Sequence, residues 1–89
     1  MLNIGTKEDE IMDFIERVGG LDNIEKISST PTKVTVLLRD EDNINPAGLH
    51  RQGVTKIVQT REGYNLFYGA GSYMLQKEVN QKLEAHRNE

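Results

Sequence analysis

The fold is decided by residues 19–40, which read Gly19-Gly20-Leu21-Asp22-Asn23-Ile24, then Thr30-Pro31-Thr32-Lys33-Val34-Thr35, and close on Arg39-Asp40. The glycine pair predicts the end of a helix, because glycine readily takes the left-handed conformation that follows helices. Residues 24–29 alternate weakly between apolar and polar side chains, and residues 34–38 are rich in β-branched side chains. Pro31 lacks a backbone donor and places a loop between these two strands. This stretch therefore predicts a helix end followed by a β-hairpin.

The flanking segments predict three helices in total. Upstream of the glycine pair, apolar side chains recur at helical spacing at Ile11, Phe14, Ile15 and Val18. Downstream, Asn45 suits the N-cap and Pro46 the first position of a short helix that ends near Gln52. We expect Ser72 to cap the last helix, whose apolar side chains recur every four residues at Leu75, Val79 and Leu83.

A second hairpin lies between the last two helices. Residues 54–60 and 64–68 predict strands, and the turn between them contains Gly63, which we expect to take positive φ. The order of elements is then helix, hairpin, helix, hairpin, helix. This order predicts an α+β two-layer sandwich, with a four-stranded antiparallel sheet and three helices on one face. We expect residues 1–89 to form one domain.

The same residues carry a family resemblance. The glycine pair, Asn23-Ile24, residues 30–35 and Asp40 resemble the enzyme IIB domain of the glucose family of the bacterial sugar phosphotransferase system. In that family a double glycine and Asn-Ile precede a Cys-x-Thr-Arg-Leu-Arg segment, and an Asp follows at matching spacing. The resemblance covers residues 8 to 83 and implies the α+β fold described above. Thr30 stands at the position of the cysteine, and Lys33 and Thr35 stand at the positions of the two arginines.

The resemblance implies a phosphoryl relay whose nucleophile is replaced in this chain. In the family, the cysteine thiolate takes a phosphoryl group from a phosphohistidine on a IIA protein or domain. The group then passes to a sugar bound by a membrane IIC domain. A threonine hydroxyl needs an adjacent general base, which neither Ser29 nor Thr32 can provide. We therefore expect Thr30 to occupy the catalytic position but to be inactive, and we expect phosphate or partner binding at Thr32, Lys33, Thr35 and Asp40.

Two functions remain open at this point, and with them the question of whether the chain is an enzyme. The first is a IIB-like domain for sugar uptake, with phosphoryl transfer lost or strongly impaired. The second is a non-catalytic regulatory or docking module that binds partners of the phosphotransferase system. In both, the resemblance implies a phosphorylated IIA protein or domain and a membrane IIC domain as partners.

Two further patterns have simpler structural interpretations. Residues 69–72, which read Gly-Ala-Gly-Ser, could hold a phosphate at a helix N-terminus, but they lack the length and lysine of a P-loop. A turn with an N-cap explains them more simply. His50 and His86 stand far apart without companions at ligand spacing, so we predict no metal site and no cofactor.

Composition limits the remaining classes. The chain has 89 residues, a net charge of −3 with both signs interspersed, and no cysteine. This charge balance argues against a nucleic-acid surface, and no apolar run is long enough for direct membrane insertion. The first six residues lack the basic and apolar regions of a signal peptide. We expect a cytoplasmic domain, which a IIC partner could hold at the inner face of the membrane.

Overall fold

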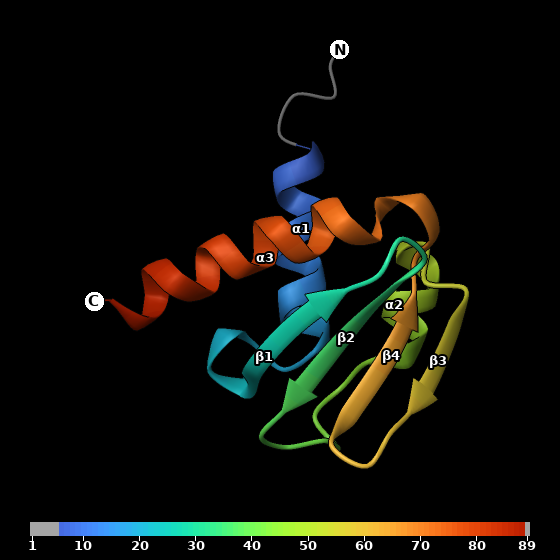
Figure 1. Ribbon diagram of the computed structural model, residues 1–89, viewed down its shortest axis with the longest axis horizontal. Coiled ribbons are helices and arrows are strands. Elements are labelled where there is room, and N and C mark those ends of the chain that lie inside the picture. Colours follow the sequence, from blue (N-terminus) through green and yellow to red (C-terminus); the bar gives the residue numbers. More distant parts are fainter. Residues whose placement is uncertain (1–5, 89) are drawn as a thin grey trace.

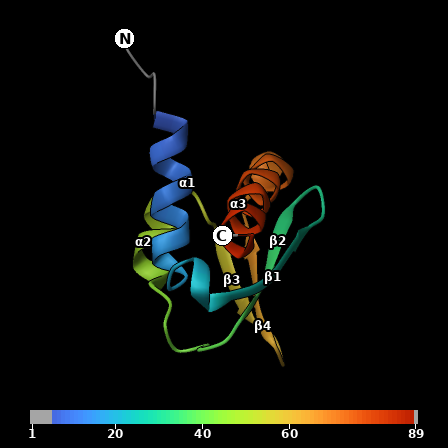
Figure 2. The same ribbon diagram turned by 90° about the vertical axis from the view of Figure 1, so that its left-hand side faces the viewer.

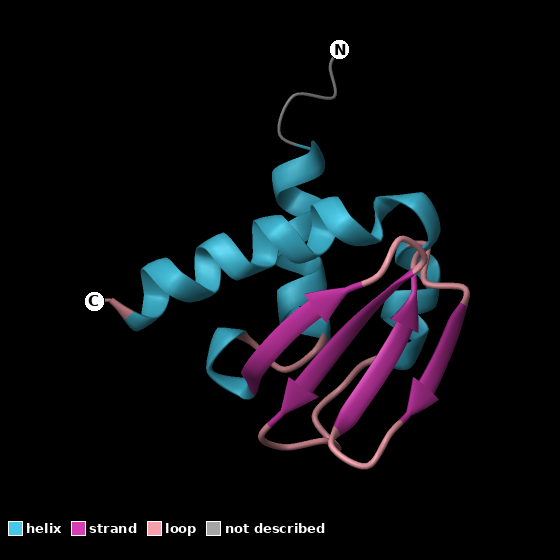
Figure 3. Cartoon of the chain, viewed as in Figure 1, coloured by secondary structure: helices cyan, strands magenta, loops and turns pink. Residues whose placement is uncertain are grey.

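The computed structural model describes residues 6–88, and the expectation about a signal peptide falls mostly outside this range. Over these residues the predicted order of three helices and four strands is confirmed (Figures 1 and 3). Two short 3₁₀ helices, η1 and η2, complete the chain. The bounds are α1 Thr6–Arg17, η1 Leu21–Asn23, β1 Ile24–Ser29, β2 Lys33–Leu38, α2 Pro46–Gln52, β3 Lys56–Gln59, β4 Gly63–Phe67, η2 Gly69–Gly71 and α3 Ser72–Arg87.

The four strands form one antiparallel sheet in the order β1-β2-β4-β3. Each hairpin pairs two strands that are consecutive in the chain, and the β2–β4 pairing joins the two hairpins. All three helices lie on one face of this sheet, as predicted (Figure 2). Helix α3 packs across β1 and β2, while α1 contacts both α2 and α3. The fold is therefore an α+β sandwich with one covered sheet face and one open face.

The hydrophobic core lies between the sheet and the helices. Alternation along β2 decides which side chains enter it, because Val34, Val36 and Leu38 are buried while their neighbours are partly exposed. The helical positions predicted from sequence periodicity all belong to this core, which contains Ile11, Phe14, Ile15, Val18, Leu75, Val79 and Leu83. Burial of these side chains supplies the main driving force that holds the helices on the sheet.

The start of β1 is fixed by a buried asparagine. The Asn23 side-chain amide donates to the backbone oxygens of Val18, at 2.9 Å, and of Asp40, at 3.1 Å. Its carbonyl oxygen accepts from the Asp40 backbone N–H at 2.8 Å. Gly19 follows α1 with φ of 97°, and a Cβ there would lie 2.4 Å from the Asn23 amide nitrogen. Glycine at this position therefore allows the positive φ at the end of α1 and leaves room for the Asn23 side chain.

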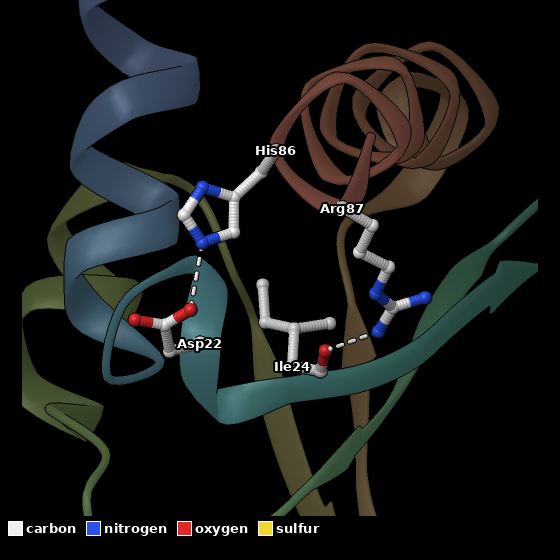
Figure 4. A network of polar contacts seen from close by, with 4 residues as sticks. All are labelled: Asp22, Ile24, His86 and Arg87. Atoms are coloured by element: carbon white, nitrogen blue, oxygen red, sulfur yellow. Dashed lines mark hydrogen bonds and ion pairs between the residues drawn. The ribbon is translucent and has the colours of Figure 1, made fainter. Parts of the chain in front are cut away.

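The last turn of α3 contacts the same end of β1 (Figure 4). His86 Nε2 lies 2.6 Å from Asp22 Oδ1, and the Arg87 guanidinium donates to the backbone oxygens of Ile24, at 2.9 Å, and Glu25, at 2.8 Å. The hydrogen bond from His86, with its charge, lowers the pKa of the exposed Asp22 carboxyl below its usual value. These contacts connect the C-terminal helix to the start of the sheet.

The second hairpin differs from the prediction in two details. Strand β3 is shorter than residues 54–60, because the Val54 N–H donates to the Leu49 carbonyl and ties Val54 to the end of α2. The expectation of positive φ at Gly63 is wrong. A Cβ at Gly63 would lie 1.9 Å from the Val36 backbone oxygen, so close approach of β2, rather than turn conformation, requires glycine here.

Candidate functional site

The loop that carries Thr30 lies at the tip of the first hairpin, at one end of the sheet (Figure 1). Thr30, Pro31 and Thr32 are exposed. The Thr30 N–H donates to the Lys33 carbonyl at 2.9 Å, so these two residues face each other where the strand pairing ends. This is the position predicted from Pro31 interrupting two strand patterns.

The Thr30 hydroxyl makes hydrogen bonds within its own loop. Its oxygen accepts from the backbone N–H groups of Thr32 and Lys33, each at 3.3 Å, and lies 3.5 Å from the Thr32 hydroxyl. Over residues 6–88, its hydrogen-bond partners include no carboxylate and no imidazole. A hydroxyl with neutral partners of this kind lacks the base that would make it a nucleophile. The contacts are those of a turn closed by a threonine side chain.

A second segment, remote in sequence, packs beside this loop. The Thr32 carbonyl accepts from the backbone N–H groups of Tyr68, at 3.2 Å, and Gly69, at 3.0 Å. A cleft of about 420 Å³ lies between the two segments and is lined by Ser29, Thr30, Pro31, Ala70 and Tyr73. The sequence indicates residues 30–35 and residues 69–72 only as separate segments, so it does not predict this cleft. The antiparallel pairing of the start of β2 with the end of β4 is what brings them together.

The prediction that Ser72 caps α3 is wrong. The 3₁₀ helix η2 runs directly into α3, and the Ser72 backbone N–H is satisfied by the Gly69 carbonyl. Ser72 therefore has helical φ and ψ, and Gly71 occupies the N-cap position without a side-chain cap. The Ser72 side chain is buried, and its hydroxyl has no hydrogen-bond partner within the described chain.

Two of the predicted binding residues have partners on the open face of the sheet. The Lys33 ammonium lies 5.7 Å from the centre of the Phe67 ring. The Thr35 hydroxyl donates to the Asn65 side-chain oxygen at 2.8 Å. Lys33 lies next to Thr30, whereas Thr35 lies two residues further along β2. The structure thus brings Thr30, Thr32 and Lys33 together at the loop.

Asp40 lies away from this group. It follows the end of β2, and a strand of six residues spans about 20 Å. Its backbone binds Asn23, and its carboxylate accepts from the Asp42 N–H at 3.0 Å. In this structure Asp40 shapes the turn after β2, and a partner-binding role for it remains a prediction.

Titratable groups near the cleft offer little acid–base chemistry. Burial, with a smaller contribution from Glu10, raises the pKa of the Tyr68 hydroxyl above its usual value, so Tyr68 stays protonated at neutral pH. His50 is bound at 2.8 Å to the Val54 carbonyl, and His86 pairs with Asp22. Across residues 6–88, no three metal-ligating side chains gather in one place. None of the described helices is both long and apolar enough to cross a membrane.

The chain is similar over most of its length to a domain whose structure has been solved. It is described as one domain of the IIabc component of the PTS system from Clostridium difficile, where PTS is the phosphotransferase system. The TM-score is 0.73 at 22% sequence identity, and the match covers 91% of this chain and 85% of that chain. This likeness shows that the two share a fold. No protein-family model and no curated protein matches the chain.

Proposed function

We propose that this chain is an enzyme IIB-like domain of a bacterial sugar phosphotransferase system, with phosphoryl transfer lost or strongly impaired. The observation that carries the proposal is the position of the Thr30 loop. A segment that resembles the family's phosphocysteine loop forms the exposed tip of the first hairpin. The fold around it is shared with a domain of a phosphotransferase component. The partners are then a phosphorylated IIA protein or domain and a membrane IIC domain, which places the chain in the cytoplasm beside the membrane.

Impaired transfer follows from the chemistry of the loop. A thiol with pKa near 8.5 is a few per cent ionised at neutral pH, whereas an alcohol is not and needs a base to remove its proton. The Thr30 oxygen instead accepts two backbone N–H groups, and its neighbour Thr32 offers only a hydroxyl. The planar guanidinium forks that bind phosphate are also missing, because Lys33 carries a point charge and Thr35 carries none.

The alternative is a non-catalytic docking or regulatory module. The observation that favours it is the self-contained hydrogen bonding of Thr30, which gives the loop a defined conformation without any phosphoryl group. Such a module would occupy a IIA or IIC partner without accepting phosphate. The two functions differ in one measurable respect, which is whether any phosphoryl group reaches this chain.

The test is incubation with a phosphorylated IIA protein, followed by intact-mass measurement. We expect binding without a stable gain of one phosphoryl group. Thr30→Ala is the matched control, because it removes the hydroxyl and leaves the loop exposed. A stoichiometric gain of one phosphoryl group that disappears in Thr30→Ala would establish transfer through Thr30. It would overturn the proposal that transfer is lost or strongly impaired. Absence of both binding and transfer would count against the phosphotransferase assignment itself.

A further inference from the structure

A second cleft lies at the other end of β1 from the Thr30 loop. It has a volume of about 410 Å³, at the lower end of the range of about 300–1,000 Å³ for ligand pockets. In Figure 2 the lower end of α1, the turn that follows it and the loop after β2 lie together. These segments line the cleft with Met12, Asp13, Ile15, Glu16, Gly19, Gly20 and Asn43. Because β1 spans about 20 Å, this cleft is separate from the site described above.

Part of the cleft is apolar and open to solvent. Ile15 belongs to the buried core, whereas the Met12 side chain is 48% exposed. A methionine side chain is flexible and polarisable, so it adapts to an apolar group placed against it. A Cβ added at Gly20 would meet no atom within 4 Å, so the space beside these side chains is free. The cleft therefore offers an apolar contact to a side chain from outside.

The border of the cleft is acidic. Asp13 and Glu16 are three residues apart on α1, so their side chains lie on the same side of the helix. Both are exposed, and neither forms an ion pair within residues 6–88. Two unpaired carboxylates beside an apolar contact are complementary to an apolar side chain that has cations next to it.

The position of these carboxylates on α1 adds to the negative potential. Glu16 lies in the last turn of the helix, where the backbone dipole already carries partial negative charge. Arg17, the basic residue of the same turn, donates to the Gln52 side chain of α2 at 2.9 Å. The whole helix contains five carboxylates and two basic residues. A carboxylate in the last turn is unfavourable for the isolated chain, and a bound cation would remove this cost.

We propose that this cleft docks a basic segment of a partner protein, in which lysine or arginine side chains flank an apolar one. The apolar side chain packs against Met12, and the cations pair with Asp13 and Glu16. Asp9 is exposed one turn before Asp13, so the acidic border continues along α1 for about 10 Å. A peptide segment can contact this whole border, whereas a small free cation would use the cleft alone. The same carboxylates repel nucleic acids and anionic lipids.

The inference uses no residue of the Thr30 loop, so its failure would leave the proposed function standing. The probe is an end-capped synthetic peptide in which two arginines flank one leucine. A second peptide has glutamates in place of the arginines, and a third has glycine in place of the leucine. Amide chemical-shift mapping locates the contact, and titration gives the dissociation constant. We expect the first peptide to shift the amides of residues 9–20 and 43, and the other two to bind at least about fivefold more weakly.

Two pairs of variants test the contacts. Glu16→Lys replaces attraction by repulsion and should weaken binding of the first peptide by about fivefold or more. Glu84→Lys makes the same charge change at an exposed position of α3 and should change binding by less than about twofold. Met12→Ala should weaken binding by about threefold or more, whereas Met74→Ala, at a methionine of α3 that is 40% exposed, should leave it nearly unchanged.

Stability measurements separate a lost contact from a lost fold. Glu16→Lys should not reduce the free energy of unfolding, because a cation is favourable in the last turn of a helix. Weaker binding by a variant that is as stable as the natural chain, or more stable, would therefore report the contact itself. Urea unfolding of all four variants makes this comparison. In the natural chain we also expect binding to weaken between about 0.05 M and about 0.3 M salt.

Three results would overturn the proposal. The first is an absence of shifts at the cleft at millimolar concentrations of the arginine peptide. The second is equal binding of this peptide by Glu16→Lys and by the natural chain. The third comes from parallel titrations with arginine amide and with calcium chloride. If either binds as tightly as the peptide and shifts the same amides, the cleft takes a small free cation rather than a segment of a partner.

Discussion

The two ends of β1 are built in opposite ways. At its start, Asn23 is buried, and its side chain binds backbone groups of Val18, Asp40 and Asn43. At its other end, Thr30 is exposed, and its hydroxyl binds only the two residues that follow in its own loop. The start of β1 is thus hydrogen-bonded to the end of α1 and to the turn after β2, whereas its other end is hydrogen-bonded only within a turn. Under the proposed function, this difference would allow the residues that resemble the family's scaffold to be kept while the residue at the position of the family's cysteine is replaced.

The largest expected effect lies at the anchored end. Gly19 and Gly20 both have positive φ, but only at Gly19 would a Cβ collide with Asn23. We expect Gly20→Ala to reduce the free energy of unfolding by about 1–3 kcal/mol through backbone strain alone, because its φ of 96° and ψ of 166° lie in a region nearly confined to glycine. Gly19→Ala should cost about 2 kcal/mol more, because it also displaces Asn23. Urea unfolding of the two variants measures the difference. Equal losses would show that the Asn23 contacts contribute little.

The next effect concerns repair of the exposed end. Thr30→Cys should supply a thiol that accepts a phosphoryl group slowly from a phosphorylated IIA protein. Adding Lys33→Arg and Thr35→Arg should raise the transfer rate by about a hundredfold, because each arginine can stabilise the thiolate and the moving phosphoryl group. Water at this exposed loop reduces the gain.

Transfer rates of the single and triple variants are compared by intact-mass time courses. Thr30→Cys combined with Lys77→Arg is the control for added arginine elsewhere. If the triple variant stays inert while its fold is intact, the fault lies in partner docking rather than in the loop chemistry. Replacement of the loop residues alone would then not account for the lack of transfer.

A smaller effect is expected when the threonine hydroxyl is removed. Thr30→Ala should lower the free energy of unfolding by less than about 1 kcal/mol, because its hydrogen bonds are exposed and local. The same urea experiment used for the glycine variants checks this value. A loss above about 2 kcal/mol would mean that the loop is as structural as the Asn23 corner.

The smallest effect is expected beside the anchored end, at the exposed pair of Asp22 and His86. The pKa of the Asp22 carboxyl is lower in the folded chain than its usual value of 3.8. Its ionised form therefore stabilises the fold at pH values above 3.8, and this stabilisation is lost as the pH falls through the still lower folded-state pKa. Carbon-detected NMR titration should find the Asp22 pKa below 3.8 in the natural chain and closer to 3.8 in His86→Gln. An unchanged Asp22 pKa in the variant would show that His86 of α3 does not lower it.

The fold was largely predictable because its signals are local or periodic. Repeats of apolar residues located α1 and α3, Pro31 separated the first two strands, and Asn45 caps α2 as expected through a bond of 3.1 Å to the Gly48 N–H. The sequence predicted positive φ at Gly63, whereas the structure requires glycine there because of close backbone approach. Its neighbour is Val36, a residue of another hairpin, and such contacts leave no local pattern.

The site was less predictable, since it depends on which segments meet. Sequence alone placed Thr30 at a hairpin tip but grouped Asp40 with it, although the length of β2 separates them. The sequence also did not predict that Lys33 and Lys56 lie on the two sides of the Phe67 ring. This arrangement requires the order β1-β2-β4-β3, and the order of the two hairpins in the sheet follows from tertiary packing rather than from any single motif.

The contact of Arg87 with β1 has a consequence for self-association. Strands at the border of a sheet offer unpaired backbone groups to other chains, and β1 is one of the two border strands here. The register shift between Ile24 and Lys26 interrupts that border, and Arg87 occupies the carbonyls of Ile24 and Glu25. The opposite border, β3, is only four residues long. Both edge strands are thus poor templates for pairing with a strand of another chain. This protects a chain whose sheet has one uncovered face from aggregating into fibres.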